Sequence, residues 1–391
     1  MRQNMKKQKP LSIVYPHNQR LMGGKANDIV IMRTCYALSQ SGQSIHVITG
    51  KPISTRDIFS YYGIKPVSEM QVVQVPMLRG RPFSWHGIFN FFCLLKILEL
   101  KKRGMADIIY LREIKLARFL LRFKRILGIP LVIEIHTLRA KKFFDSSPAI
   151  NRSEQYVFQN VNGIVVLLHT LAQFLREIYH VENIPILKVP HAAEKSPFTF
   201  HHTGQRTVCY IGQLYPLQGV EILIEAMGYL DNARLSIIGG SSQDIARLKN
   251  LAAEKNVDQR IDFHGFVEPR MVTEKARRAD VMVICALNKG DRRYAAHTKL
   301  YEYMAMGKPI VAVDLPSIRE EVKDRENILL VAPEDPKSLA EGIAEILNNP
   351  KLAEYLAVNA HASADEFSWE KKAERLSNFF QQVHADYHEK H

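Results

Sequence analysis

The 391-residue sequence holds few cysteines and no long apolar run, and both shortages narrow the class of protein. The cysteines stand far apart, without the close spacing of a zinc site or a disulfide framework, at Cys35, Cys93, Cys209 and Cys285. We therefore expect a reducing compartment, the cytoplasm, and no metal site. No stretch reaches the ~20 uninterrupted apolar residues that a membrane-spanning helix needs. These shortages exclude a disulfide-rich secreted domain and an integral membrane protein.

The usual phosphate-binding motifs are also missing. Gly23-Gly24, ahead of the first predicted helix, is not part of a GxGxxG fingerprint, and Gly307-Lys308-Pro309 lacks the flanking residues of a Walker A motif. Paired glycines before a helix nevertheless let backbone N–H groups approach a phosphate. A tight turn is the alternative interpretation, so the pair indicates an anion site only in combination with other features.

The net positive charge of the sequence comes entirely from its first half. Residues 1–200 hold 29 lysines and arginines against 12 acidic residues, whereas residues 201–391 hold 24 against 28. A field of one sign over one domain indicates an anionic partner there. Basic residues that only keep the domain soluble are the alternative. No nucleic-acid motif with interleaved aromatic residues is present, so we do not expect DNA or RNA as the partner.

Short β-branched runs alternate with longer helical patterns along the whole chain, and this predicts a doubly wound parallel sheet twice over. The predicted strands are Ser12–Tyr15, Ile45–Thr49, Val72–Val75, Asp107–Leu111, Leu131–Ile135, Gly163–Leu168, Ile186–Val189, Thr207–Ile211, Arg234–Ile238, Arg260–Phe263, Asp280–Cys285, Pro309–Val313 and Ile328–Val331. The polar segment Glu194–Arg206 separates the halves. We therefore predict an α/β protein with a first domain over residues 1–195, a second over 206–367 and a terminal helix over 368–391.

The residues that follow the predicted strands are the places to look for a ligand, because open α/β sheets bind beyond the carboxyl ends of their strands. His136 follows Leu131–Ile135, and a structural hydrogen-bonding histidine is its alternative role. Glycines recur after successive strands of the second half, in Gly212-Gln213-Leu214, Gly239-Gly240 and His264-Gly265-Phe266-Val267, and Gln218-Gly219 opens a helix. This recurrence indicates a nucleotide pocket in the second domain.

The strongest element is the segment HTKLYEYMAMGKPIVAV, His297–Val313. Thr298 is a suitable N-cap and Gly307 a suitable helix stop. The first turn of the helix offers backbone N–H groups to an anion, with Lys299 beside them. Glu302 lies one turn further, where a carboxylate can accept hydrogen bonds from two vicinal hydroxyls. An ion pair between Glu302 and Lys299 on a solvated helix face is the alternative.

Together these segments resemble the retaining glycosyltransferases of family four, the group 1 glycosyltransferases, whose GT-B fold has two Rossmann-like domains facing a cleft. KLYEYMAMGKPIVA is similar to the family's donor-site helix, and DRENILLVAPEDPKSLAEGI to the segment that follows it. VIEIHT resembles the strand that places a histidine near the donor sugar. FSWEKKAERL resembles the terminal helix that crosses back to the first domain. The likeness covers nearly the whole chain and implies the GT-B fold.

The resemblance implies transfer of a sugar from a UDP- or GDP-linked donor, with retention at the anomeric carbon and without a required metal or other cofactor. The absence of an Asp-x-Asp motif agrees with this. Asp291 would contact a sugar hydroxyl in place of the family's second glutamate, where this sequence has Tyr294. The implied donor-binding residues are Gly24, Gly212, Gln213, Gln218, Phe266, Val267, Arg293, Thr298, Lys299, Leu300 and Glu302, and the implied catalytic residues are His136 and Asp291.

Within this set the resemblance implies separate roles. The N–H groups near Thr298–Leu300 would hold the diphosphate, and Glu302 would hold the ribose. Phe266 and Val267 would border the base. His136 would contact the sugar and help to stabilise the charge that develops on it.

The sequence departs from the family pattern at the phosphates. Gln213 and Gln218 stand where the family usually has an arginine and a lysine that clamp the diphosphate. Losing two charged partners costs several kcal/mol if nothing replaces them, at ~1.5–3 kcal/mol per charged hydrogen bond. Lys299 and the pair Arg292-Arg293 are the expected replacements, because they lie in and directly before the donor-site helix.

The acceptor is expected on the basic first domain, as an anionic or lipid-linked precursor of the cell envelope. Basic residues gather at Arg112, Lys115, Arg118, Arg122, Lys124 and Arg125, and apolar ones at Phe89, Phe91, Phe92, Leu94 and Leu95. Such residues suit a lipid-diphosphate acceptor or the anionic inner face of the cytoplasmic membrane, with ordinary core as the alternative for the apolar set. A catalytically weak binding or partner subunit is the alternative for the whole chain, and Gln213, Gln218 and Tyr294 motivate it.

Overall fold

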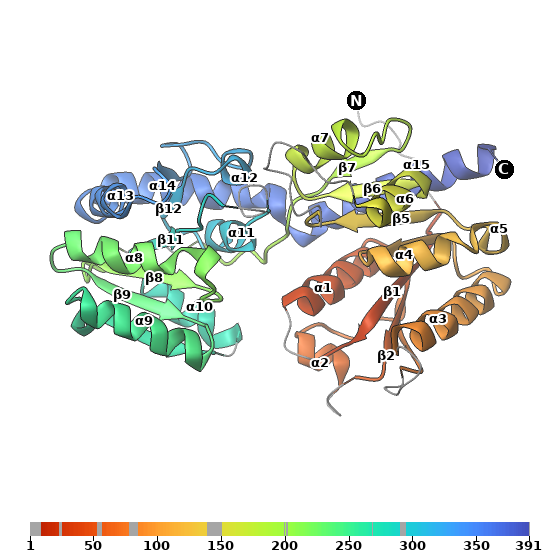
Figure 1. Ribbon diagram of the computed structural model, residues 1–391, viewed down its shortest axis with the longest axis horizontal. Helices are drawn as coiled ribbons and strands as arrows, with labels where there is room; N and C mark the ends of the chain where they lie inside the picture. The colour runs from red at the N-terminus through yellow and green to blue at the C-terminus, as the bar shows by residue number, and fades with distance from the viewer. Residues whose placement is uncertain are drawn as a thin grey trace. The chain divides into compact units, whose positions relative to one another are not determined.

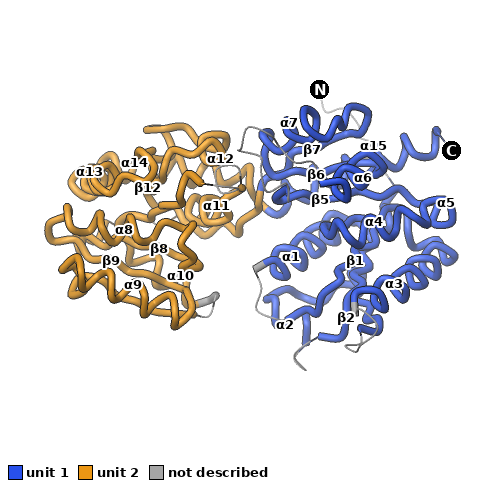
Figure 2. Tube along the Cα trace, viewed as in Figure 1, with its two compact units in different colours: residues 1–190, 369–391 blue, residues 191–368 orange. Residues whose placement is uncertain are grey.

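The computed structural model describes residues 9–22, 26–52, 57–77, 85–138, 151–198, 200, 202–267, 269–289 and 295–390 (Figure 1). The chain divides into two compact units (Figure 2). Unit 1 comprises residues 1–190 together with 369–391, and unit 2 comprises residues 191–368. Residues 191–195, which we assigned to the first domain, lie in unit 2, where the Ala193 N–H donates to the Phe367 carbonyl over 2.9 Å.

Unit 1 is built on a parallel seven-stranded sheet in the order β3-β2-β1-β4-β5-β6-β7. Its strands are β1 (Ser12–Arg20), β2 (Ser44–Gly50), β3 (Met70–Val75), β4 (Ile108–Leu111), β5 (Leu131–Ile135), β6 (Gly163–Val166) and β7 (Ile186–Lys188). Its helices are α1 (Ala26–Gln40), α2 (Ile58–Tyr62), α3 (Trp85–Lys102), α4 (Ile114–Leu121), α5 (Lys124–Leu127), α6 (Arg152–Asn160), α7 (His169–Glu177) and α15 (Trp369–Lys390). Every residue of β4, β5 and β6 is buried, which explains their nearly continuous apolar sequence.

The helix α15 follows unit 2 in the sequence but packs in unit 1, against α1. Its side chains Leu376, Phe380 and Val383 are buried in the same apolar cluster as residues of β1 and β4. The Phe380 ring lies 4.9 Å from the ring of Tyr110 on β4. The helix begins at Trp369, directly after Ser368. The predicted return of the terminal helix to the first domain is therefore observed.

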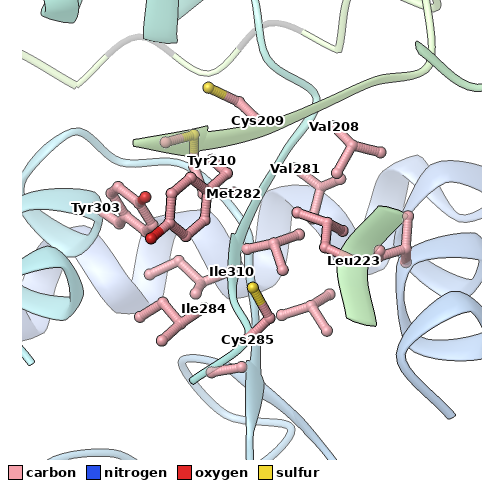
Figure 3. Packing of buried hydrophobic residues seen from close by; sticks show 14 of the residues in the cluster. Val208, Cys209, Tyr210, Leu223, Val281, Met282, Ile284, Cys285, Tyr303 and Ile310 are labelled. Carbon is pink, nitrogen blue, oxygen red and sulfur yellow. The ribbon is translucent and has the colours of Figure 1, made fainter. Parts of the chain in front are cut away.

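Unit 2 is built on a parallel six-stranded sheet in the order β10-β9-β8-β11-β12-β13. Its strands are β8 (Thr207–Ile211), β9 (Arg234–Ile238), β10 (Ile261–Gly265), β11 (Val281–Ile284), β12 (Ile310–Val313) and β13 (Leu329–Val331). Its α-helices are α8 (Val220–Ala226), α9 (Ser242–Glu254), α10 (Pro269–Arg277), α11 (Thr298–Ala305), α12 (Pro316–Arg319), α13 (Pro336–Asn348) and α14 (Pro350–Ser363). Figure 3 shows Val208, Met282 and Ile310 from three neighbouring strands in its apolar core.

The fold class predicted from the sequence, two doubly wound parallel sheets with a returning terminal helix, is confirmed. The first strand is longer than predicted, because β1 continues past Tyr15 and keeps pairing with β2, with a register shift between His17 and Arg20. Among the residues that the structure describes, we find no helix with the length and apolar character to cross a membrane.

Candidate functional site

The carboxyl ends of β8, β9 and β10 lie side by side in unit 2, because these three strands are neighbours in the sheet. The turns that follow them are joined by backbone hydrogen bonds. The Gly212 N–H donates to the Ile238 carbonyl over 2.9 Å, and the Gly239 N–H donates to the Gly265 carbonyl over 2.7 Å. We call these three turns, residues 212–213, 239–240 and 265–267, the strand-end rim. The rim unites glycines that the sequence shows only as separate short motifs.

Two glycines of the strand-end rim hold conformations and contacts that exclude a side chain. Gly239 has φ +111°, and a Cβ atom there would lie 2.4 Å from the Gly212 carbonyl oxygen. Gly212 has φ +142°, and a Cβ atom there would lie 2.5 Å from Cε of Lys299. The absence of side chains therefore lets two turns and the Lys299 side chain converge at one point.

The helix α11 begins beside the strand-end rim, in the position of the predicted anion-binding helix. The prediction that Thr298 is its N-cap is wrong, because His297 holds the extended N-cap conformation and Thr298 is the first helical residue. The Leu300 N–H donates to the His297 carbonyl over 2.9 Å. Gly307 ends the helix with φ +64°, as predicted.

Tyr303 fixes α11 to the end of β8. Its hydroxyl accepts a hydrogen bond from the Ile211 N–H over 2.9 Å, and the side chain is fully buried. Figure 3 shows Tyr303 and Tyr210 among the apolar side chains of the core. Leu300 is buried, whereas Thr298 and Lys299 are half-buried and Glu302 is exposed. The helix thus turns one apolar face to the core and keeps Glu302 on the solvent side.

Lys299 places its ammonium group at the end of β8. Its Nζ donates to the Tyr210 hydroxyl over 2.6 Å and to Gln218 Oε1 over 2.7 Å. The same atom lies 4.2 Å from the centre of the Tyr210 ring. The Tyr210 hydroxyl in turn donates to the Gln213 carbonyl over 2.7 Å. A cation therefore contacts the Gln218 side chain and, through the Tyr210 hydroxyl, the Gln213 carbonyl; these are the two positions where the resemblance implies a basic pair.

The two glutamines differ in exposure. Gln218 is buried at the end of the 3₁₀ helix η1 (Pro216–Gln218), whereas the Gln213 side chain is exposed on the strand-end rim. Phe266, at the end of β10, is 81% exposed, which is unusual for a phenylalanine. Val267 is half-buried and packs against the core of unit 2. Five predicted positions lie outside the described residues, namely Gly24, Asp291, Arg292, Arg293 and Tyr294.

His136 lies in unit 1, directly after β5. Its Nε2 lies 2.9 Å from Oε1 of Glu134, which is buried within β5. The Tyr110 hydroxyl donates to Oε2 of Glu134 over 2.7 Å. Nζ of Lys372, on α15, lies 3.5 Å from Oε1. The predicted catalytic histidine therefore belongs to a buried cluster of ionisable side chains.

Burial and the guanidinium of Arg112 together lower the pKa of His136 to about 4, against the opposing effect of Glu134. Burial alone would raise the pKa of the Glu134 carboxyl. Lys372, His136 and Arg112 outweigh burial and hold that pKa well below its usual range. At neutral pH the carboxylate is thus ionised and the imidazole is neutral, so His136 itself supplies no positive charge.

The comparisons with known proteins agree with this architecture. A family model described as glycosyl transferases group 1 matches residues 192–363. These residues are a group 1 glycosyltransferase domain. An uncharacterized glycosyltransferase of Methanocaldococcus jannaschii is 22% identical over 94% of this chain and 96% of its own length. A D-inositol 3-phosphate glycosyltransferase of Corynebacterium efficiens is 27% identical over 65% of this chain and 66% of its own length.

Two solved structures extend the likeness to the fold of both units. Sucrose-phosphate synthase from Thermosynechococcus elongatus has a TM-score of 0.75 at 19% identity, over 96% of this chain and 100% of that one. An Anabaena protein in complex with UDP has a TM-score of 0.72 at 15% identity, over 95% of this chain and 100% of that one. The predicted likeness to the group 1 glycosyltransferases and the predicted GT-B fold are confirmed.

The apolar and basic sets predicted in the first domain have different environments in unit 1. Phe89 and Leu94 are buried, so ordinary core is the correct interpretation for them. Their neighbours Phe91, Phe92 and Leu95 are exposed on α3, which packs against α4 and α5. The exposed basic residues of those two helices and the turn between them are Lys115, Arg118, Arg122 and Arg125. An apolar and a basic surface therefore lie on neighbouring helices of unit 1.

Sequence reasoning missed three residues around the predicted site residues. Glu134 contacts His136, Lys372 contacts Glu134, and Tyr210 contacts Lys299. Glu134 interrupts an otherwise apolar strand, and a charge inside a fully buried strand is a signal that could have been used. Lys372 lies on the buried face of α15, between Trp369 and Leu376, at the helical spacing of that face. Tyr210 gave no signal, because an aromatic residue in a buried strand is ordinary.

Proposed function

We propose that this glycosyltransferase transfers a sugar from a nucleoside-diphosphate sugar to a hydroxyl of an acceptor, with retention at the anomeric carbon. The observation that carries the proposal is the Lys299 ammonium at the end of β8, hydrogen-bonded to Tyr210 and Gln218 beside the first turn of α11. The leaving diphosphate is a dianion or more, and a fixed cation at a helix N-terminus stabilises it. No metal is needed in this proposal, because the ammonium and the backbone dipoles supply the positive potential.

In this proposal Lys299 replaces the arginine and lysine that the family usually has at the positions of Gln213 and Gln218. The side-chain oxygen Oε1 of Gln218 and the Tyr210 hydroxyl both accept hydrogen bonds from the ammonium. In this proposal these side chains position the charge and do not bind phosphate themselves. Gln213 lies exposed on the strand-end rim and offers its amide to a phosphate oxygen. The backbone N–H of Thr298 is aligned with the helix dipole. Gly24 and Arg293 complete the proposed phosphate contacts from the sequence pattern. The Leu300 N–H, which the sequence pattern also implies, already donates to the His297 carbonyl.

The nucleoside binds along the strand-end rim in this proposal. Phe266 supports a flat base, because a highly exposed aromatic ring at a strand end is available for stacking. Val267 borders the same place. Glu302 accepts hydrogen bonds from the two ribose hydroxyls on the exposed side of α11. UDP is the favoured nucleotide over GDP, since Anabaena structures of the same fold contain UDP and UDP-glucose.

The transferred sugar contacts His136 and Asp291 in this proposal. His136 is neutral, so it acts as a hydrogen-bonding partner of a sugar hydroxyl, and the charge that develops at the anomeric carbon is stabilised by the departing phosphate instead. Retention follows when the acceptor hydroxyl attacks the face from which the diphosphate leaves. The acceptor proton then passes to a phosphate oxygen, so the reaction needs no separate base.

The acceptor is an anionic or lipid-linked glycoconjugate precursor, bound to unit 1 at the inner face of the cytoplasmic membrane. Phe91, with 53% of its surface exposed, lies with Phe92 on a helix that packs against the basic helices α4 and α5. Apolar side chains next to lysines and arginines favour an anionic lipid surface. The relative from Corynebacterium efficiens bears the name of a phosphorylated substrate, which supports an anionic acceptor here.

A thermal-shift screen of UDP, GDP and their sugars, followed by measurement of donor hydrolysis, tests the proposed activity. We expect one nucleotide to raise the melting temperature, and one of its sugars to be hydrolysed or transferred. Glu302→Ala should abolish the turnover. Binding without turnover of any donor would favour the catalytically weak partner subunit, and no binding of any nucleotide would refute the proposed function.

A further inference from the structure

Glu134 is a carboxylate in the middle of the core of unit 1. It is buried in β5 among leucine, valine and isoleucine residues, where an ionised group is costly unless charges and hydrogen bonds compensate it. Tyr110 donates to one carboxylate oxygen over 2.7 Å, and His136 and Lys372 meet the other at 2.9 and 3.5 Å. A cluster of buried groups with mutually shifted pKa values, next to the strand end that carries His136, points to a role in the site.

The protonation states of this cluster follow from its surroundings. Glu134 is ionised, because Lys372 and Arg112 outweigh the effect of burial on its pKa. Burial raises the pKa of Tyr110 well above its usual value, so its hydroxyl keeps the proton that it donates. The pKa of Lys372 is lowered by burial and supported by Glu134. The charged groups that face His136 are Glu134 on its own strand, Arg112 after β4 and Lys372 on α15.

These states fix the tautomer of His136. An ionised carboxylate can only accept hydrogen bonds, and a neutral imidazole carries a single N–H. The contact of Nε2 with Oε1 of Glu134 therefore requires the proton on Nε2. Nδ1 then presents a lone pair, which makes it an acceptor. The imidazole is 16% exposed, at the carboxyl end of its strand, where ligands of parallel sheets bind.

We propose that Glu134 and Lys372 are positioning residues for His136. Lys372 keeps Glu134 ionised, and Glu134 holds the imidazole as the Nε2–H tautomer, whose Nδ1 accepts a hydrogen bond from a substrate hydroxyl. The ligand that this arrangement recognises is a hydroxyl donor, such as a sugar, and not an anion, which a lone pair would repel. The hydrogen bond from a substrate hydroxyl to Nδ1 rests on the proposed function. The Nε2–H tautomer, and its control by Glu134 and Lys372, do not rest on it.

Histidine nitrogen NMR tests the arrangement without any substrate. The protein is labelled with ¹⁵N-histidine, and His136 is assigned by the signal that disappears in His136→Gln. We expect the Nε2–H tautomer at pH 7 and no protonation of the ring down to about pH 5. The Nδ1–H tautomer or an imidazolium at pH 7 would overturn the inference.

Substitutions of Lys372 and Tyr110 test whether these residues control the pKa of His136. Lys372→Met removes a nearby cation that lowers the pKa of His136, so this pKa should rise. Lys371→Met is the matched control, since that side chain is on the same turn of α15 but exposed, and its titration should match wild type. An unchanged His136 titration in Lys372→Met would refute the role of Lys372. Tyr110→Phe, which keeps the ring in the core, is a second variant and should also raise the pKa of His136, because the carboxylate then shares its charge with fewer donors.

Kinetics separate this inference from the proposed function. With UDP-glucose as the probe, hydrolysis by wild type should be independent of pH between about 5.5 and 7.5. In Lys372→Met, kcat should fall on the acid side of that window, with little change in KM. A purely structural role would lower the rate equally at every pH. If NMR shows the Nε2–H tautomer but the protein turns over no donor, the proposed function is refuted. The inference that Glu134 and Lys372 position His136 would then still stand.

Discussion

Replacing Lys299 with methionine is the sharpest test of how the phosphates are bound. The substitution keeps the length and the apolar stem of the side chain, which passes directly over Gly212, and removes the ammonium. A charged hydrogen bond contributes about 1.5–3 kcal/mol. Since about 1.4 kcal/mol corresponds to a factor of ten in affinity, UDP should bind about ten- to a hundred-fold more weakly.

Isothermal titration of UDP at two salt concentrations gives the decisive measurement. The difference between wild type and Lys299→Met should shrink at high salt, because the partly exposed charge is screened there. Tyr210→Phe is the companion variant. It removes the hydroxyl that receives the ammonium at 2.6 Å but leaves the charge, so the loss of affinity should be smaller, about two- to ten-fold.

The control must separate lost binding from lost stability. In Lys299→Met the carbonyl oxygen of the buried Gln218 loses its 2.7 Å donor, which costs about 1–3 kcal/mol of folding free energy. Urea unfolding without nucleotide measures that part. Lys337→Met, at an exposed position of α13, changes the net charge equally and should leave UDP affinity unchanged. If Lys299→Met bound UDP within about two-fold of wild type, the proposed replacement of the basic pair would be wrong.

Three further predictions concern the backbone, the membrane and pH. Gly239→Ala should lower the free energy of unfolding by about 2–4 kcal/mol in urea titrations, whereas Gly228→Ala, with open space around it, should not be destabilised by a clash. Phe91→Ser with Phe92→Ser should reduce co-sedimentation with anionic liposomes, and equal binding by wild type to neutral liposomes would contradict an anionic surface. The pKa of Glu134 is depressed in the folded state, so its stabilising contribution is present above about pH 4.3 and is lost as pH falls below that value. The difference in the free energy of unfolding between wild type and Glu134→Gln should therefore shrink in acid.

The strands could be predicted from sequence because they are buried on both faces. Runs such as Leu131–Ile135 and Thr207–Ile211 show the same bounds in the structure. The glycines that follow β8 and β9 and end β10 mark the carboxyl edge of the second sheet. The first residue of α11 could not be fixed in the same way. Thr298 has the side chain of an N-cap, but the backbone of His297 holds the extended conformation, and side-chain preference is weaker than the path of the chain.

The contacts that define the site depend on the order of the strands, which the sequence does not state. Lys299 reaches Gln218 across 81 positions of the sequence because β8 and β11 are neighbours in the sheet. Lys372 meets Glu134 because α15 returns to unit 1. A pattern along the chain identifies a buried charge, but its partner appears only when the strands and helices are assembled.

The return of α15 also has a consequence for the order in which the protein folds during synthesis. Residues 1–190 leave the ribosome first, yet their apolar cluster includes Leu376 and Phe380, which are made only after the whole of unit 2. Unit 2 is continuous in sequence and can close its core as soon as residue 368 has emerged. The domain that starts first is therefore completed last, and until then the apolar surface that α15 covers is open to chaperones and to other nascent chains.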